Sequence, residues 1–182
     1  YIIQNINIFT KKPNNEIKGF VDFSYGNYNT QRYTGGLRGA LIKDKLFFGA
    51  VGMFNKQDGF YRNDFTKMNY DNQRGVQGNY YLKFQANKRL SFLVNVKHQL
   101  QLNSGAFPLT GSAAEAFSNP FVLDQNNTTQ MRDKTFNGSL SINYYHSNFS
   151  FTSQTSYQEN YRFYVDPIDG DFSSNDIISV IN

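Results

Sequence analysis

The residues of this sequence best suited to binding a ligand are the aromatic and arginine side chains in its long polar stretches. Guanidinium groups pair with carboxylates and phosphates, and aromatic faces attract cations. Together, such side chains suit an anionic, partly aromatic metal chelate. The candidates for ligand contact are Phe60, Tyr61, Arg62, Tyr70, Arg74, Phe107, Phe117, Phe121 and Arg132. Packing of the polar stretches among themselves is the alternative role for any one of them.

A second set of polar residues alternates with uncharged residues, which is the period of a β-strand. Arg32 and Arg38 share one side of such a strand, while Tyr33 and Leu37 share the other. Facing lipid at the membrane midplane would cost Arg or Lys about 2–4 kcal/mol, so in a membrane this set must face a watery interior. The residues expected to line that interior are Lys18, Asp22, Arg32, Arg38, Lys83, Asn95 and Lys97. Two roles are open for them: they hydrogen-bond another domain held inside the intact protein, or they simply hydrate the inner wall.

No residue pattern predicts catalysis, a bound metal or a cofactor, so we expect a protein that is not an enzyme. His98 and His146 lie far apart, with no partner at the spacing of a metal site or a catalytic dyad. The run from Asp166 to Asp171 lacks the closing glutamate of a calcium-binding loop. The chain has no cysteine, which excludes a metal site with thiolate ligands. Its 18 Lys and Arg residues are scattered along the chain, which argues against nucleic acid as a partner.

Alternating apolar and polar residues predict seven long strands as the elements that position these side chains. Aromatic residues make up 17% of the chain, too many for a disordered protein. A short strand at Ile2–Phe9 and a short helix at Ser112–Phe117 are also expected. In the segment from Leu46 to Asp58 both faces are apolar, so the sequence does not assign its facing. The long strands are expected at about residues 16–28, 30–42, 46–58, 74–86, 90–102, 134–145 and 149–161.

The connections between these strands favour an all-β, antiparallel, up-and-down transmembrane β-barrel. The turns at Lys43–Lys45, Ala86–Arg89 and His146–Asn148 are short, and the connections that alternate with them are long. Membrane barrels have this asymmetry, and bacterial ones have an even number of strands. Seven strands would leave two unpaired edges, so we expect a segment of a larger barrel. A soluble β-sandwich, such as an adhesin or a carbohydrate-binding domain, is the alternative.

Four stretches near the N-terminus resemble the junction between plug and barrel in TonB-dependent outer-membrane receptors. Ile6 to Pro13 resembles the final plug strand, and Tyr25 to Thr30 resembles the end of the first barrel strand. Lys43 to Phe48 resembles the next turn, and Asp58 to Asn63 the end of the third strand. The resemblance covers about residues 5–65 and rests on architecture alone beyond them.

This resemblance implies that residues 1–13 end a plug domain and its linker, and that residues 14–182 form the N-terminal part of a barrel of about 22 strands. The whole protein would lie in the outer membrane of a Gram-negative bacterium, in contact with its lipids. It would import iron–siderophore complexes or a similar large nutrient, with energy from the TonB–ExbB–ExbD complex acting on the plug. The plug would be the domain that the interior residues hydrogen-bond. A passive porin or channel is the alternative within the same membrane.

Overall fold

The computed structural model describes residues 13–105, 113–126, 128–166, 168–169 and 179–180. Phe107 and the expected strand at Ile2–Phe9 lie outside the described residues. The prediction of seven long strands is confirmed: they form one antiparallel sheet in the order β1-β2-β3-β6-β7-β9-β10. The strands are β1 (Lys18–Gly26), β2 (Thr30–Ile42), β3 (Leu46–Gln57), β6 (Gln73–Gln85), β7 (Leu90–Ser104), β9 (Gln130–Tyr145) and β10 (Ser150–Tyr164).

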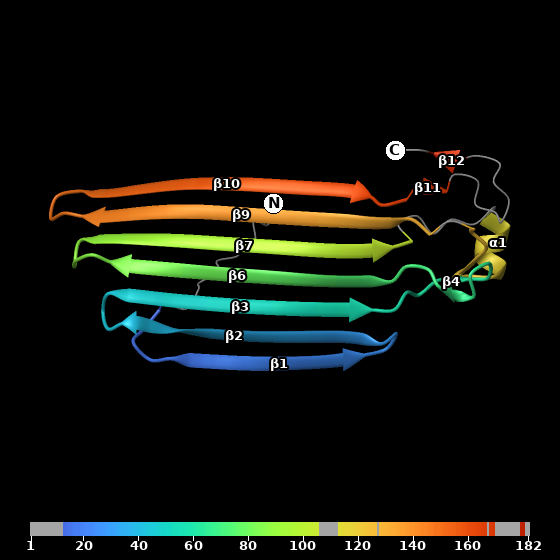
Figure 1. Ribbon diagram of the computed structural model, residues 1–182, viewed down its shortest axis with the longest axis horizontal. Helices are drawn as coiled ribbons and strands as arrows, with labels where there is room; N and C mark the ends of the chain where they lie inside the picture. Colours follow the sequence, from blue (N-terminus) through green and yellow to red (C-terminus); the bar gives the residue numbers. More distant parts are fainter. Residues whose placement is uncertain (1–12, 106–112, 127, 167, 170–178, 181–182) are drawn as a thin grey trace, which may run out of the picture.

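The long sheet runs up and down with sequence neighbours paired, and it is not closed into a barrel. Within the described ranges β1 and β10 are its two free edges. The turns β2–β3, β6–β7 and β9–β10 all lie at the left of Figure 1, and the longer connections lie at the right. We call the end of the sheet with the three short turns the turn end, and the opposite end the loop end. The one short connection at the loop end joins β1 to β2, where Tyr28 and Asn29 take left-handed φ angles of 56° and 52°.

The loop end carries small elements that the sequence did not predict, in addition to the expected helix. Strands β4 (Arg62–Asn63), β5 (Met68–Asn69) and β8 (Val122–Leu123) form a separate three-stranded sheet. Helix α1 (Ala113–Ser118) confirms the expected short helix, and β11 (Ile168–Asp169) pairs with β12 (Ser179–Val180). In the described part of the chain, no helix has the length and apolarity needed to cross a membrane.

The two faces of the long sheet differ in chemistry across all seven strands. Because residues paired between antiparallel strands share a face, the register assigns the paired strand residues to one side of the sheet or the other, and it shifts only between Ala40 and Ile42 of β2. The row Gly39–Phe48–Leu82–Val94–Leu140 crosses the apolar face. The row Arg32–Asn55–Gly75–Gln101–Asp133 crosses the polar face. The predicted alternation is therefore confirmed as a property of the whole sheet.

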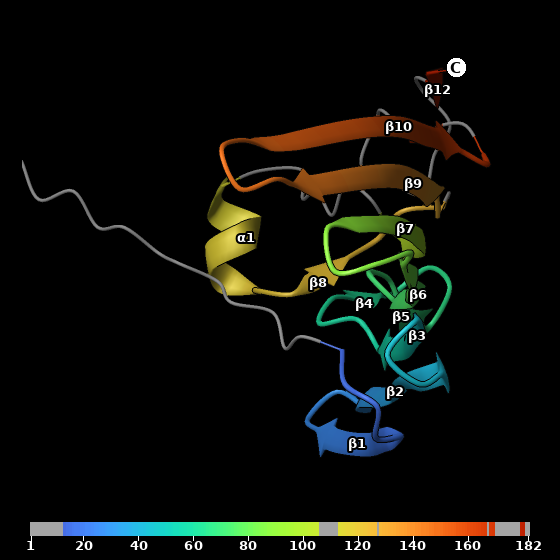
Figure 2. The ribbon, with the colours of Figure 1, turned by 90° about the vertical axis from the view of Figure 1, so that its left-hand side faces the viewer.

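The register also assigns the facing of β3. Leu46, Phe48 and Phe54 lie on the apolar face, whereas Phe47 and Met53 lie among polar residues on the other face. Viewed nearly along the strands, the sheet is curved, with α1 and β8 on its hollow side (Figure 2). Along β6 and β9 the side chains of the apolar face are mostly the more exposed, as on the outside of a curved sheet. We therefore assign the apolar face to the convex side.

Two glycines of β3, Gly49 on the polar face and Gly52 on the apolar face, test how tightly the space beside each is packed. A Cβ on Gly49 would lie 2.2 Å from Cε1 and 2.7 Å from Cζ of Tyr81, whereas a Cβ on Gly52 would meet no heavy atom within 4 Å. We expect Gly49→Ala to lower the free energy of unfolding by about 1–3 kcal/mol, because the Tyr81 ring must leave its position. Gly52→Ala should be neutral or slightly stabilising. Urea unfolding of both variants checks this, and equal effects would contradict the packing described.

Candidate functional site

The polar face gathers the seven residues that were predicted to line an interior. Lys18 pairs directly with Arg38 across β1 and β2, and Asp22 pairs with Thr34. Lys83 and Lys97 project from the same face of β6 and β7. Arg32 and Asn95 complete the set through their partners Asn55 and Ser139. The structure thus places all seven on the polar face.

Two shallow hollows lie on this face between the strands that carry its cations. The larger, of about 490 Å³, is bounded by Lys18, Arg38 and the aromatic rings of Phe20 and Tyr81. The second, of about 390 Å³, is bounded by Arg32 and Lys97 together with polar residues of β6 and β9. Each hollow therefore combines two cations with neutral hydrogen-bonding or aromatic groups.

The charge on the polar face is distributed unevenly between the first five long strands and the last two. Strands β1 to β7 carry five cations there against the single carboxylate of Asp22. Lys18 pairs with Glu16 at 2.5 Å, and this hydrogen bond lowers the pKa of the Glu16 carboxyl. Among the described residues, Arg32, Arg38, Lys83 and Lys97 have no carboxylate within 4.0 Å. The first five long strands therefore present a positively charged surface.

The part of the polar face formed by β9 and β10 is close to neutral. Its charged groups are Asp133 and Arg162, and Arg162 donates from Nε to Asp133 Oδ2 at 3.0 Å. Its other side chains are mostly amides and hydroxyls, such as Asn160, which donates to Thr135 Oγ1 at 2.9 Å. Such groups satisfy one another or water and add no net charge.

Three polar atoms on the polar face are shielded from solvent without a hydrogen-bond partner in the described part of the chain. They are Thr34 Oγ1, Asn55 Oδ1 and the Tyr81 hydroxyl. Thr34 and Asn55 lie on the neighbouring strands β2 and β3, and Tyr81 borders the larger hollow. A shielded polar group without a partner costs about 1–3 kcal/mol, so these atoms favour a further polar surface or water against this face.

The predicted loop residues lie partly in a compact cap at the loop end, formed by residues 59–72, 119–126 and 128–129. Two main-chain bonds join the two segments: Arg62 N–H donates to Phe121 O, and Asp64 N–H donates to Leu123 O, both at 2.8 Å. Inside the cap, the Asn63 side chain donates to Gln125 O at 2.7 Å. The buried side chains of the cap include Asn63, Tyr70, Leu123, Gln125 and Thr129, each at most 4% exposed.

The aromatic candidates of the cap mostly contact each other or nearby aromatic rings. Tyr61 meets Phe121 edge-on at 5.5 Å between ring centroids, and Phe60 lies 4.5 Å from Tyr28. Tyr70 is buried, which gives it a packing role in the cap. Phe117 on α1 is 88% exposed. The cap therefore contains one aromatic pair of its own, Tyr61 and Phe121, while Phe60 packs against Tyr28 of the β1–β2 connection.

The three arginine candidates lie in two different places. Arg62 belongs to the cap, where its Nε lies 3.1 Å from Asp64 Oδ1 and its side chain stays largely exposed. Arg74 and Arg132 belong to β6 and β9 and lie on the apolar face of the long sheet. The sequence prediction placed Arg132 in a loop and Arg74 at the start of a strand, and it grouped both with the loop candidates because a cation at a strand end resembles a loop residue. The structure brings neither of them to the aromatic pair of the cap.

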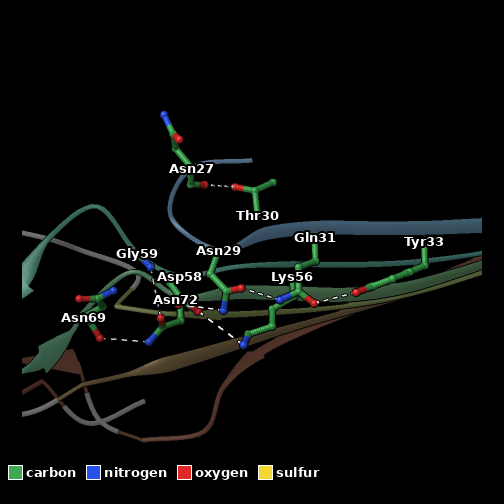
Figure 3. Close-up of polar contacts among 10 residues, drawn as sticks. All are labelled: Asn27, Asn29, Thr30, Gln31, Tyr33, Lys56, Asp58, Gly59, Asn69 and Asn72. Atoms are coloured by element: carbon green, nitrogen blue, oxygen red, sulfur yellow. Dashed lines mark hydrogen bonds and ion pairs between the residues drawn. The ribbon is translucent and has the colours of Figure 1, made fainter. Parts of the chain in front are cut away.

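A chain of polar side chains borders the apolar face at the loop end (Figure 3). The Tyr33 hydroxyl donates to Gln31 Oε1 at 3.0 Å, and Gln31 Nε2 donates to Asn29 Oδ1 at 2.5 Å. Asn29 Nδ2 donates to Asp58 Oδ2 at 3.1 Å, and Lys56 Nζ lies 3.7 Å from Asp58 Oδ1. The apolar face thus ends in a polar belt in which the described side chains pair with one another.

The chain matches no protein-family model and no solved structure. The family is therefore not identified by comparison. What is established is a mostly-β protein with a seven-stranded antiparallel sheet.

The cations, amides and hydroxyls of the polar face suit non-covalent binding of anions and polar molecules. Among the described residues no three His, Cys, Asp or Glu side chains come together in a way that could hold a metal ion. The polar face offers cations, amides and hydroxyls over a broad surface, and the cap offers an aromatic pair next to Arg62. Sequence reasoning missed Tyr81, Asn79 and Gln77, which line the hollows. Their place in the polar register of β6 is the signal that could have found them.

Proposed function

We propose that this chain forms part of the wall of an outer-membrane β-barrel belonging to a TonB-dependent receptor. Its apolar face contacts lipid, its polar face lines the lumen, and its cap lies at the outer opening. The whole protein imports iron–siderophore complexes or a similar large nutrient with energy from TonB. The lipid-facing role rests on the sheet itself, and the choice of family rests on the resemblance of about residues 5–65.

One observation carries the membrane part of this proposal: an apolar face that is left exposed across seven strands. Val21 is 74% exposed, and Leu37, Leu82 and Val94 are 44–47% exposed. In a soluble sandwich a second sheet covers the inner face. In the described ranges no second layer covers these residues. A contiguous apolar surface of this extent marks contact with a membrane or another apolar partner.

The length of the uncharged stretch on the apolar face supports a bilayer location. On β3 it extends from Leu46 at the turn end to Phe54, the last residue of this face before Lys56. Eight residue steps correspond to about 26 Å along a strand. At a strand tilt of about 40°, the height is about 20 Å, most of the roughly 25 Å apolar band of outer-membrane barrels.

The histidine of the apolar face is also accommodated as a membrane would require. His98 Nε2 lies 3.0 Å from the Tyr80 hydroxyl, and the two rings stack at 5.6 Å. Gly78 leaves the space for them, since a Cβ there would lie 2.3 Å from His98 Nε2. Polar groups within a membrane pair in this way because lipid offers them no hydrogen bond.

Uptake of labelled iron–siderophore complexes by cells carrying the full-length protein tests the transport function. We expect accumulation in cells with functional TonB and none in otherwise identical cells that lack it. Uptake without TonB would instead identify a passive channel. No uptake of any siderophore or comparable large nutrient in either strain would refute the import function.

A further inference from the structure

Four cations lie on the apolar face, all close to the loop end. Lys56 and Arg74 pair directly with each other on β3 and β6. Leu102 separates Arg74 from Arg132 in the same row, and Lys134 follows on β9. We call Lys56, Arg74, Arg132 and Lys134 the basic rim. The apolar-face positions of the seven long strands between the rim and the turn end contain no lysine or arginine.

The protein itself neutralises little of the charge of the basic rim. Asp58 lies 3.7 Å from Lys56, but no carboxylate of the described residues lies within 4.0 Å of Arg74, Arg132 or Lys134. Glu159 is the only acid among the apolar-face positions of the seven strands, and it accepts a hydrogen bond from the Tyr157 hydroxyl at 3.4 Å. Like charges opposite each other in a sheet are destabilising, so the pair of Lys56 and Arg74 favours an external anion.

The neighbours of the basic rim are those of a membrane interface. Arg132 and Lys134 each lie 5.9 Å from the centre of the Phe163 ring, and Tyr33 and Tyr161 lie in the adjoining row. Aromatic side chains of this kind collect at the level of lipid headgroups. The rim therefore lies where an apolar band meets charged headgroups.

We infer that the basic rim binds the phosphate groups of anionic lipids in the leaflet on the loop side. This inference rests on the proposed function, because it requires the apolar face to contact lipid. Guanidinium and ammonium groups bind phosphate through charge-assisted hydrogen bonds. Alignment of the four cations across β3, β6 and β9 allows neighbouring headgroups to be held along one line.

The test compares lipid binding by the protein in maltoside detergent micelles, with short-chain phosphatidylglycerol and phosphatidylcholine as probes. Lysine or arginine near an anionic lipid surface strengthens binding about five-fold each, so Lys56→Gln with Arg74→Gln should weaken phosphatidylglycerol binding roughly 25-fold. Phosphatidylcholine binding should not change. The matched control, Lys88→Gln with Arg89→Gln, removes the same two residue types from a short turn and should leave binding near wild type.

The outcomes separate this inference from the proposed function. Equal losses in the two double variants, or wild-type protein without a preference for phosphatidylglycerol, would overturn the lipid site. Equally tight binding of inorganic phosphate would overturn it too, since the site would then recognise a free anion. Protein that stays monodisperse in buffer without detergent would instead refute the membrane location.

Discussion

Arginine in place of Val94 should lower the stability of the membrane-inserted protein by about 2–4 kcal/mol, the cost of a cation facing lipid near the midplane. Val94 lies on the apolar face between Leu82 and Leu140, in the middle of the uncharged stretch of β7. It is 45% exposed in the isolated chain. Urea unfolding in phospholipid vesicles measures the change as a shift of the midpoint at constant slope.

The same substitution would have a different effect if water covered the apolar face. Surface substitutions in soluble proteins usually change stability by less than about 0.5 kcal/mol. A small effect of Val94→Arg would therefore contradict the lipid contact, whether or not the whole protein imports a nutrient. Gln99→Arg is the matched control on the same strand, because Gln99 lies on the polar face between Gln77 and Thr135. We expect it to be close to neutral.

The long strands and their facing were predictable because the property that specifies them is local. Each strand needs only a period of two, and the chain repeats that period with few breaks, such as Leu93 on the polar face and His98 on the apolar face. Strand ends were less predictable. Strand β9 begins at Gln130, before the expected Lys134, because β7 extends to Ser104 and offers partners to Gln130 through Asp133.

The facing of β3 could not be predicted because its alternation is weak. Phe47, Val51 and Met53 are as apolar as the residues that face the other way. Pairing with β2 and β6 determines which side chains of β3 face the polar side, since Phe47 lies opposite Lys83 and Met53 lies opposite Gln77. The partner strands supply the polarity that β3 lacks.

The cap and the basic rim depend on contacts between distant parts of the chain. Strand β4 pairs in parallel with β8, which brings Arg62 next to Val122. A two-residue strand has too few residues to show a period. The rim was missed for a related reason: Lys56, Arg74 and Arg132 come from three different strand ends, and only the register aligns them.

Replacing Asn63 by alanine should open the cap and leave the long sheet intact. Asn63 is fully buried, its Nδ2 donates to Gln125 O at 2.7 Å, and its Oδ1 accepts from Phe65 N–H at 3.1 Å. Removal of the side-chain amide leaves one acceptor and one donor without these partners, at about 1–3 kcal/mol for each group. Because the bond to Gln125 joins segments 62 residues apart, its loss also weakens the link between the two halves of the cap.

Amide hydrogen exchange distinguishes this local opening from general unfolding, because regions of a protein open with different free energies. The Arg62 and Asp64 amides bond across the cap to Phe121 O and Leu123 O, so they should exchange faster in the variant. The amides of β6 and β7 should keep their protection. Asn69→Ala, at an exposed position of β5, is the matched control and should change neither set. Parallel loss of protection in cap and sheet would mean that the cap is no separate unit, and unchanged exchange at Arg62 and Asp64 would mean that Asn63 does not hold it. If the cap opens as expected, Tyr61 and Phe121 lose their fixed spacing, and any ligand that requires both rings should bind less tightly.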